Sequence, residues 1–215
     1  MPLADTNIEI GGRNWTIRAV PNEDVLLQAD VDYERFPFGL LLWESAVALA
    51  RHLAENPAQV KGRRVLELGA GVGLAGMAAQ WLGAAVWQTD HQPDALGLAQ
   101  INAANNGIGN MKHFLADWRH WTHTPRYPVV LGADILYQRA MHPYLAEVFA
   151  AALEPGGALL LTDPGRPQAL DFIAQLESEG WRFGVETQTV LLTGEGRANQ
   201  PVEVAVYKGV RALAG

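Results

Sequence analysis

The sequence contains no cysteine in its 215 residues, and basic residues are fewer than acidic ones. Without cysteine the chain forms no disulfide bond, no thiolate metal site and no cysteine nucleophile. The 16 Lys and Arg residues against 23 Asp and Glu residues give a formal net charge of −7. This charge disfavours a broad phosphate-binding surface, so we expect no nucleic-acid partner, although a basic protein remains a compatible substrate.

Long hydrophobic runs are absent as well. No apolar run approaches the roughly 20 residues of a membrane span, and the opening MPLADTNIEI lacks the basic-then-apolar pattern of a signal peptide. Apolar residues make up 49% of the chain and charged residues 18%, which is typical of a globular protein. We therefore expect a single domain over residues 1–215, acting as a monomer in the cytoplasm without a membrane partner.

Predicted strands and helices alternate along the chain. Apolar runs typical of buried parallel strands occur at 63–69, 84–90, 111–117, 127–134 and 157–163. Predicted helices accompany them at 39–57, 74–82, 95–107, 139–153 and 168–180. The last two strands, 182–190 and 202–208, have no helix between them, so we expect them to pair antiparallel.

This order predicts an α/β fold: a Rossmann-like doubly wound sheet of seven strands, mostly parallel with an antiparallel last strand. A short N-terminal β-hairpin at residues 8–20, turning at Gly11 and Gly12, and a helix precede that sheet.

A glycine-rich stretch, VLELGAGVGLAGM at 65–77, lies where a predicted strand runs into a helix. Ligands of doubly wound sheets bind at such carboxyl ends of strands, where glycine lets the backbone come close. Gly71, Gly73 and Gly76 match the dinucleotide fingerprint Gly-x-Gly-x-x-Gly, which alone is a weak signal. Alternatively, Glu67, two residues before Gly69, makes the stretch similar to a loop that binds a sulfonium amino acid.

Three features favour the sulfonium ligand. Asp90 ends the next strand, where a carboxylate accepts both ribose hydroxyls of either kind of cofactor. Glu67 would repel a pyrophosphate but tolerates a cationic ligand. Asp117 and Trp118 follow the third strand and suit an adenine ring, one binding its amine and the other packing on its face. Trp118 as a core residue and Asp117 as a turn cap stay open alternatives.

These motifs together resemble the class I S-adenosylmethionine-dependent methyltransferases. The resemblance rests on VLELGAGVGLAG, the Asp90 strand end, the pair at 117–118 and VVLGADILY at 129–137. More narrowly, Asp134-Ile-Leu-Tyr137 is similar to the Asp-x-x-Tyr hallmark of the protein-lysine methyltransferases of the family 16 type. The resemblance covers about residues 36–210, which we take as the catalytic core. Residues 1–35 would then form an N-terminal hairpin extension.

The resemblance implies S-adenosylmethionine as cofactor, S-adenosylhomocysteine as product and a protein lysine as acceptor. Gly39 to Trp43 is similar to a Gly-x-x-x-Trp segment that lies over the methionine end of the cofactor. The implied cofactor-binding residues are Trp43, Glu67, Gly69, Ala70, Gly71, Gly73, Asp90, His91, Asp117, Trp118 and Ala133. The segment TDPGRPQ at 162–168 is similar to one in lysine methyltransferases of the electron-transfer flavoprotein β subunit and their bacterial relatives, whose glycine loop differs in detail.

Asp134 and Tyr137 are the expected catalytic residues. A lysine nucleophile must lose its proton, which desolvation near a sulfonium favours, and a carboxylate orients the amine. Tyr137 would line the lysine channel or bond the amine. Methyltransferases of planar amide or base nitrogens usually carry two prolines where Ile135 and Leu136 stand, which argues against such acceptors. As an alternative, Asp134 caps a helix.

Other interpretations stay open. Trp43 lies on the apolar face of the predicted helix 39–55, where plain core packing explains it too. His91 either lines the adenosine pocket or lies on the surface, and the PGRP turn is either merely rigid or directs Arg166 to an acidic partner. We expect no metal at Asp117, His120 and His123, because their spacing of three lies in a loop.

The main functional alternative is a small-molecule N-methyltransferase using the same cofactor site. A nicotinamide-dependent oxidoreductase and a binding module without catalysis are the readings from other classes. Titration with S-adenosylmethionine against NAD distinguishes a methyltransferase from an oxidoreductase. Product formation distinguishes an enzyme from a binding module.

Overall fold

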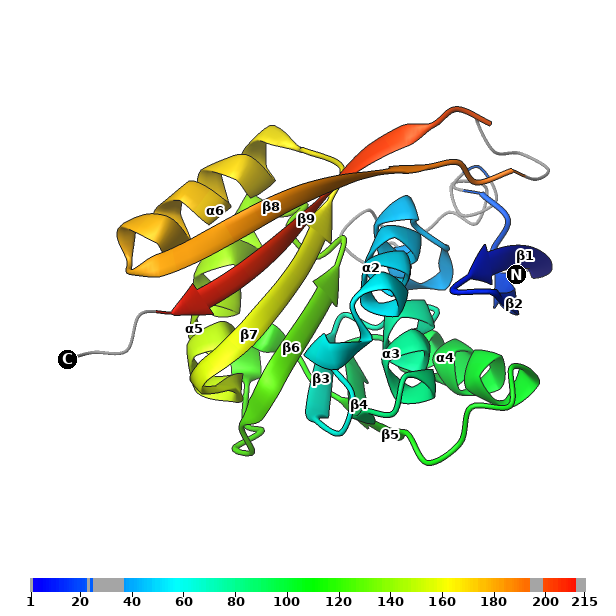
Figure 1. The fold of residues 1–215 in the computed structure, drawn as a ribbon, viewed down its shortest axis with the longest axis horizontal. Helices are drawn as coiled ribbons and strands as arrows, with labels where there is room; N and C mark the ends of the chain where they lie inside the picture. The colour runs from blue at the N-terminus through cyan, green and yellow to red at the C-terminus, as the bar shows by residue number, and fades with distance from the viewer. Residues whose placement is uncertain (1, 23, 25–36, 194–198, 212–215) are drawn as a thin grey trace.

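The computed structural model describes residues 2–22, 24, 37–193 and 199–211. Seven strands form one sheet in the order β5-β4-β3-β6-β7-β9-β8 (Figure 1). They are β3 (Arg64–Leu68), β4 (Ala85–Asp90), β5 (Lys112–Leu115), β6 (Tyr127–Ala133), β7 (Leu153–Asp163), β8 (Trp181–Val190) and β9 (Val202–Arg211). Strands β3 to β7 run parallel, whereas β9 is antiparallel to both β7 and β8. The predicted fold is confirmed, including the antiparallel last strand.

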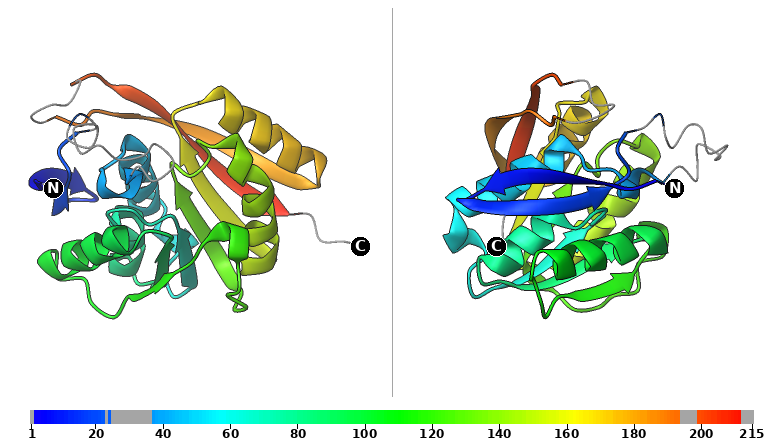
Figure 2. Two further views of the ribbon diagram at one scale, coloured as in Figure 1. Left: turned by 180° about the vertical axis from the view of Figure 1, so that it is seen from behind. Right: turned by 90° about the vertical axis from the view of Figure 1, so that its right-hand side faces the viewer.

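Helices cover both faces of the sheet. They are α2 (Glu44–Glu55), α3 (Leu74–Trp81), α4 (Pro93–Asn105), α5 (His142–Ala152) and α6 (Pro167–Ser178). Helices α2 to α4 lie in front of the sheet in Figure 1, and α5 and α6 come to the front when the molecule is turned (Figure 2).

Successive side chains of one strand point to opposite faces of the sheet, as the pleat of a strand requires, and each face has its own hydrophobic cluster. Leu66 packs in the cluster that contains Phe149 of α5, whereas its neighbour Val65 packs in the cluster that contains Leu49 of α2. Both sides of the central strands are therefore largely apolar, which is why their sequence is rich in hydrophobic residues.

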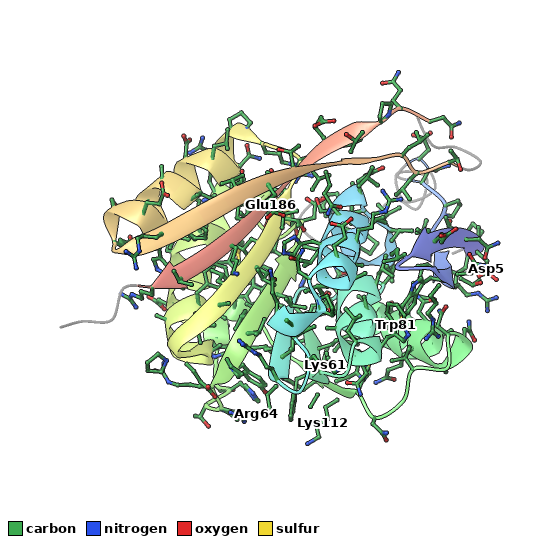
Figure 3. All side chains as sticks on the ribbon, in the orientation of Figure 1. Asp5, Lys61, Arg64, Trp81, Lys112 and Glu186 are labelled. Carbon is green, nitrogen blue, oxygen red and sulfur yellow. The ribbon has the colours of Figure 1, made fainter. Side chains whose placement is uncertain are left out.

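The predicted hairpin forms a separate two-stranded sheet, β1 (Ala4–Ile10) and β2 (Arg13–Ala19). Gly11 and Gly12 make its turn with φ of 61° and 75°, the left-handed conformation that a two-residue hairpin turn needs. The hairpin lies beside α3 and α4, where the ring of Trp15 meets that of Trp81 edge to face at 5.8 Å (Figure 3).

The structure corrects some element boundaries. Helix α2 begins at Glu44, not at residue 39, because residues 38–40 form a 3₁₀ turn and Trp43 has the extended dihedrals φ −95° and ψ 148°. Trp43 therefore precedes the helix, and its predicted place on a helical face was wrong. Strand β5 ends at Leu115, so Asp117 lies in the loop that follows.

Two of the expected features fall on residues that the structure does not describe. The boundary between the proposed extension and the core, at residues 35 and 36, lies outside the described residues, as does the middle of the loop 193–201.

Among the helices that the structure describes, none is long and apolar enough to cross a membrane.

Candidate functional site

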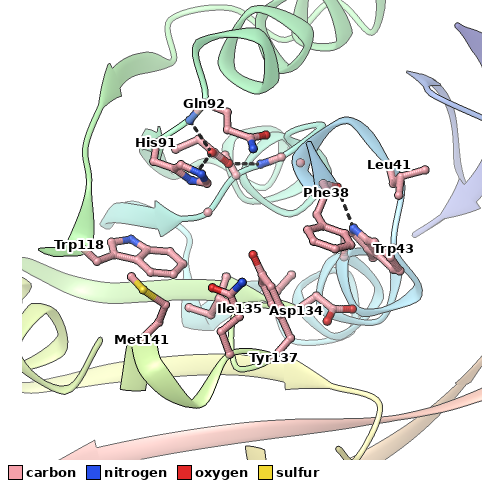
Figure 4. Close-up of a pocket in the computed structure, with 18 of the residues that line it drawn as sticks. Phe38, Leu41, Trp43, His91, Gln92, Trp118, Asp134, Ile135, Tyr137 and Met141 are labelled. Atoms are coloured by element: carbon pink, nitrogen blue, oxygen red, sulfur yellow. Dashed lines mark hydrogen bonds and ion pairs between the residues drawn. The ribbon is translucent and has the colours of Figure 1, made fainter. Parts of the chain in front are cut away.

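A cavity of about 450 Å³ lies at the carboxyl ends of the parallel strands (Figure 4). The loops that follow β3, β4, β5 and β6 line it, together with the loop after β7 and the segment before α2. Eleven of the predicted site residues line the cavity: Trp43, Gly69, Ala70, Gly71, Asp90, His91, Asp117, Trp118, Ala133, Asp134 and Tyr137. The side chain of Glu67 and the backbone of Gly73 do not.

The glycine loop between β3 and α3 is held in a conformation that requires glycine. Gly71 has a φ of 53°, and a Cβ on it would lie 3.1 Å from the backbone oxygen of Gly39. A Cβ on Gly76 would collide with the side chains of Glu67 and Gln88. The glycines thus allow the loop to lie close both to residue 39 and to the buried polar groups beneath it.

Asp90 fixes the loop from the end of β4. Its Oδ2 accepts a hydrogen bond from the backbone N–H of Gly71 and its Oδ1 one from that of Gln92, each 3.0 Å long (Figure 4). The side chain is 6% exposed, and Oδ2, which accepts one hydrogen bond from the protein, keeps a lone pair for a ligand. His91 Nδ1 lies 3.3 Å from Asp90 Oδ1, and this hydrogen bond raises the pKa of His91.

Glu67 lies beneath the loop rather than in the cavity. Its Oε2 accepts hydrogen bonds from the backbone N–H of Gly76 at 3.0 Å and from Gln88 Nε2 at 2.5 Å. Gln88 Nε2 also donates to the carbonyl of Gly73 at 2.9 Å. Burial raises the pKa of Glu67 from 4.5 to about 7. Glu67 and Gln88 therefore brace the loop from inside the protein.

Asp117 and Trp118 lie on the side of the cavity formed after β5. Asp117 accepts hydrogen bonds from the Arg119 side chain and backbone, and this contact lowers the pKa of Asp117 to about 2. It therefore caps the short 3₁₀ turn at 118–120 while also lining the cavity. The half-buried Trp118 ring lies close enough to Gly69 that a Cβ there would be 3.3 Å from it.

Asp134 follows β6 in the left-handed conformation, with a φ of 59°. Its backbone N–H donates to the Thr162 carbonyl at 2.9 Å, which ties it to β7. The carboxylate is 8% exposed and pairs with the Arg166 guanidinium. Burial raises the pKa of Asp134, and the charge of Arg166 acts against that rise. The alternative of a helix cap is wrong, because the next helical segment begins at Arg139.

Aromatic rings surround this end of the cavity. The ring of Phe38 lies 5.6 Å from that of Tyr137 and 6.3 Å from that of Trp43 (Figure 4). Trp43 Nε1 donates to the Phe38 carbonyl at 3.0 Å, and the Tyr137 carbonyl accepts from Gln168 Nε2 at 3.1 Å. Trp43 both packs against the core and lines the cavity, so its two interpretations are compatible.

Sequence reasoning missed part of the lining. Gln92, Gln138 and Met141 belong to none of the motifs in the sequence and enter the cavity only through the path of the chain. The PGRP turn did carry a signal, since its Arg166 faces acidic partners.

The three residues weighed as metal ligands do not converge. His120 Nδ1 lies 3.8 Å from Asp117 Oδ2, whereas His123 Nε2 bonds the Tyr127 hydroxyl at 2.8 Å. His123 also stacks on Phe114 at 4.4 Å. Within the described part of the chain, no three acidic or histidine side chains are grouped to hold a metal ion.

Known proteins are similar to this chain in sequence and in fold. The profile of a family described as lysine methyltransferase matches residues 21–179. Protein N-lysine methyltransferase METTL21A of Danio rerio is 36% identical over 123 residues, 54% of this chain and 56% of the relative. The electron transfer flavoprotein beta subunit lysine methyltransferase of Mus musculus is 30% identical over 137 residues, 61% of this chain and 52% of the relative. The chain thus spans just over half the length of these two relatives.

Among solved structures, the T. Thermophilus 16S rRNA N2 G1207 methyltransferase (RsmC), in complex with AdoMet and guanosine, has a TM-score of 0.65 at 19% identity. The match covers 99% of this chain and 51% of that one. At this identity it bears on the fold alone.

Proposed function

The chain belongs to the lysine methyltransferase family, and on that premise we propose that it transfers a methyl group from S-adenosylmethionine to a lysine side chain of a protein. One observation carries the proposal: a single cavity joins the glycine loop and Asp90 at one end to Asp134 and Tyr137 at the other. Such an arrangement would allow a cofactor and an acceptor group to lie side by side. The curated relatives with protein-lysine activity support the acceptor class.

The cavity suits S-adenosylmethionine. Its volume lies within the usual range of small-molecule sites, roughly 300–1,000 Å³. We assign the ribose hydroxyls to Asp90, which lines the cavity and keeps a free lone pair on Oδ2, and the adenine ring to Trp118 with Asp117 beside it. The methionine part would lie against the loop at Gly69, Ala70 and Gly71, which line the cavity. Glu67 and Gly73 act through the loop, without contact with the cofactor.

The acceptor end supplies the remaining requirements of methyl transfer. The bound cofactor provides the activated methyl group. Asp134 orients the amine and stabilises the positive charge that develops on it. Phe38, Trp43 and Tyr137 exclude water from the reacting nitrogen, and Tyr137 is placed to contact the acceptor. Exclusion of water also favours the neutral amine, which alone has the lone pair that attacks.

The remaining assignments are proposals from charge and composition. We propose one methyltransferase domain that acts as a cytoplasmic monomer on a protein, without a nucleic-acid or membrane partner. The net charge of −7 supports the exclusion of nucleic acid.

Labelling tests the function directly. The protein is incubated with radiolabelled S-adenosylmethionine and a bacterial lysate, and the proteins are then separated from small molecules. We expect label in a protein band, released by hydrolysis as methyl-lysine. Label confined to small molecules would favour the small-molecule N-methyltransferase, and binding of NAD in place of S-adenosylmethionine would favour an oxidoreductase. Gly71→Val is the inactive control, because its side chain collides with residue 39.

A further inference from the structure

Arg166 joins two carboxylates at the acceptor end of the cavity. It lies in the loop between β7 and α6, and its NH1 group donates to Asp134 Oδ1 and, at 2.9 Å, to Asp163 Oδ2. Its backbone N–H donates to Asp163 Oδ1 at 2.7 Å. Asp134 follows β6 and Asp163 is the last residue of the neighbouring parallel strand β7, so the guanidinium bridges the ends of two strands.

The two carboxylates differ in their access to the cavity. The side chain of Asp163 is fully buried, whereas Asp134 and Arg166 both line the cavity. Asp163 thus holds Arg166 through the backbone and the side chain, and Arg166 in turn holds Asp134. Oδ1 of Asp134 bonds the guanidinium, and Asp134 lines the cavity that an acceptor would enter.

Charge makes the bridge necessary. Two buried carboxylates at adjacent strand ends disfavour each other's ionised form, and one of them would take up a proton without a cation between them. The guanidinium of Arg166 lies between the two carboxylates and offsets one of their negative charges. Burial and the charge of Asp163 raise the pKa of Asp134, and Arg166 opposes both.

We propose that Arg166 is a positioning residue for the acceptor: its bridge from Asp163 keeps the Asp134 carboxylate charged and turned so that one oxygen receives the amine. This proposal rests on the proposed function, in which Asp134 orients a lysine. The guanidinium suits the role better than an ammonium, because it stays charged at all working pH values and bonds in fixed directions.

Other polar groups near the cluster are few among the described residues. The Ser45 hydroxyl on α2 lowers the pKa of Asp134, and burial together with the charge of Asp163 raises the pKa of Tyr207 on β9. Neither carries a positive charge, so Arg166 is the cation that balances Asp134 in this part of the structure.

A first experiment measures methyl transfer. Arg166→Ala should lower turnover by roughly tenfold to a hundredfold while S-adenosylhomocysteine binds as in the wild type. Guanidinium chloride at low millimolar concentration should restore part of the turnover, whereas sodium chloride at equal ionic strength should not. The control is Arg64→Ala, which removes an exposed arginine paired with Glu154 at the other end of the sheet (Figure 3). Unchanged turnover in Arg166→Ala would overturn the proposal.

A double-mutant cycle then separates positioning from general stability. If Arg166 acts through Asp134, Arg166→Gln should cost at most about threefold in turnover in an Asp134→Asn background. An equal loss in both backgrounds would contradict the proposal. Should Arg166→Gln fold poorly by melting temperature, Arg166→Lys replaces it and should show a smaller loss of the same pattern.

A second experiment needs no turnover. Aspartate carboxyl carbons are labelled with ¹³C, the Asp134 signal is assigned with Asp134→Asn, and its titration is followed by NMR. In Arg166→Gln the Asp134 carboxyl should titrate at higher pH than in the wild type. An identical titration would refute the role of Arg166. If this shift is found but no protein is labelled, the proposed function fails and the electrostatic link stands.

Discussion

The side-chain amide of Asn102 joins the N-terminal hairpin to the glycine loop by donating to the Val72 carbonyl at 3.0 Å. The same Nδ2 donates to the Arg18 carbonyl at 2.9 Å, and Oδ1 accepts from the Arg18 backbone N–H at 2.8 Å. Asn102 is fully buried on α4. It therefore pairs with β2 as a neighbouring strand would, and holds the loop at the same time.

Asn102→Ala should weaken both attachments. Loss of three buried hydrogen bonds leaves unpaired backbone groups, and we expect a loss of about 2–4 kcal/mol in the free energy of unfolding. Asn106→Ala is the matched control, since Asn106 bonds the backbone of Thr16 in β2 in the same manner but does not touch the loop. By calorimetry, affinity for S-adenosylhomocysteine should fall more in Asn102→Ala. Equal affinities in the two variants would show that the hairpin is not coupled to the loop.

Asp90→Ala should abolish much of the cofactor affinity. It removes the proposed bonds to the ribose and the acceptor of the Gly71 N–H, and about 2–4 kcal/mol of binding free energy should be lost. Calorimetry with S-adenosylhomocysteine measures this change. Asp94→Ala removes an exposed carboxylate from the first turn of α4 and should bind normally. Wild-type affinity in Asp90→Ala would defeat the assignment of the ribose.

Trp118→Ala tests the adenine pocket. Loss of the stacking area should weaken S-adenosylhomocysteine binding by roughly 1–3 kcal/mol and leave the domain folded. Trp121→Ala provides the comparison, because Trp121 packs on Phe114 and lies outside the cavity lining. If Trp118→Ala lowers the melting temperature strongly but binds the cofactor normally, Trp118 belongs to the core and adenine recognition lies elsewhere.

Glu67 makes stability depend on pH in a defined direction. Below pH 4.5 its carboxyl is protonated in both the folded and the unfolded chain, and between 4.5 and about 7 only the folded protein keeps the proton. Because the folded state binds more protons there, its contribution to the unfolding free energy falls by about 1.4 kcal/mol per pH unit and levels off above pH 7.

Glu67→Gln should remove this dependence. Urea denaturation between pH 5 and 8 should show the variant gaining stability relative to the wild type as pH rises. Glu177→Gln, an exposed position on α6, should follow the wild type. Parallel curves for Glu67→Gln and the wild type would indicate that the buried carboxyl does not titrate in this range.

Local patterns in the sequence predict the fold well because each element carries its own signal. Strand β6 is almost entirely apolar, and Gly11-Gly12 favours a tight turn. The start of α2 was misplaced because residues 39–43 are apolar in a way that suits a helix, while the observed backbone is set by contact of Gly39 with the glycine loop. Such a contact between distant segments leaves no periodic signal.

In the candidate site, too, some positions follow from local patterns and topology, whereas others depend on contacts between distant segments. Asp90 and Asp134 end strands of a parallel sheet, so topology alone brings them to one edge. Glu67 also stands near a strand end, yet its side chain turns under the loop, because Gln88 and the Gly76 N–H offer it buried partners. The pairing of Arg166 with Asp134 joins residues 32 positions apart and depends on the adjacency of β6 and β7.

The sharpest test of the chemistry is Asp134→Asn. Asparagine tolerates the left-handed backbone with φ of 59° and keeps the shape of the side chain, but it lacks the charge that favours an incoming amine. Turnover should fall at least about a hundredfold, the scale of one preorganised electrostatic contact. S-Adenosylhomocysteine affinity should hardly change, because the proposed ribose and adenine contacts lie on β4 and after β5.

Asp171→Asn is the matched control for that variant, since Asp171 is an exposed carboxylate on α6 that pairs with Arg139. Methyl transfer to the labelled lysate protein and a binding titration are measured on both variants. Near-normal turnover in Asp134→Asn would remove its catalytic role and make the small-molecule alternative the stronger one. A variant that binds the cofactor but transfers no methyl group would place the acceptor amine beside Asp134, because binding and chemistry would then have been separated by a single charge.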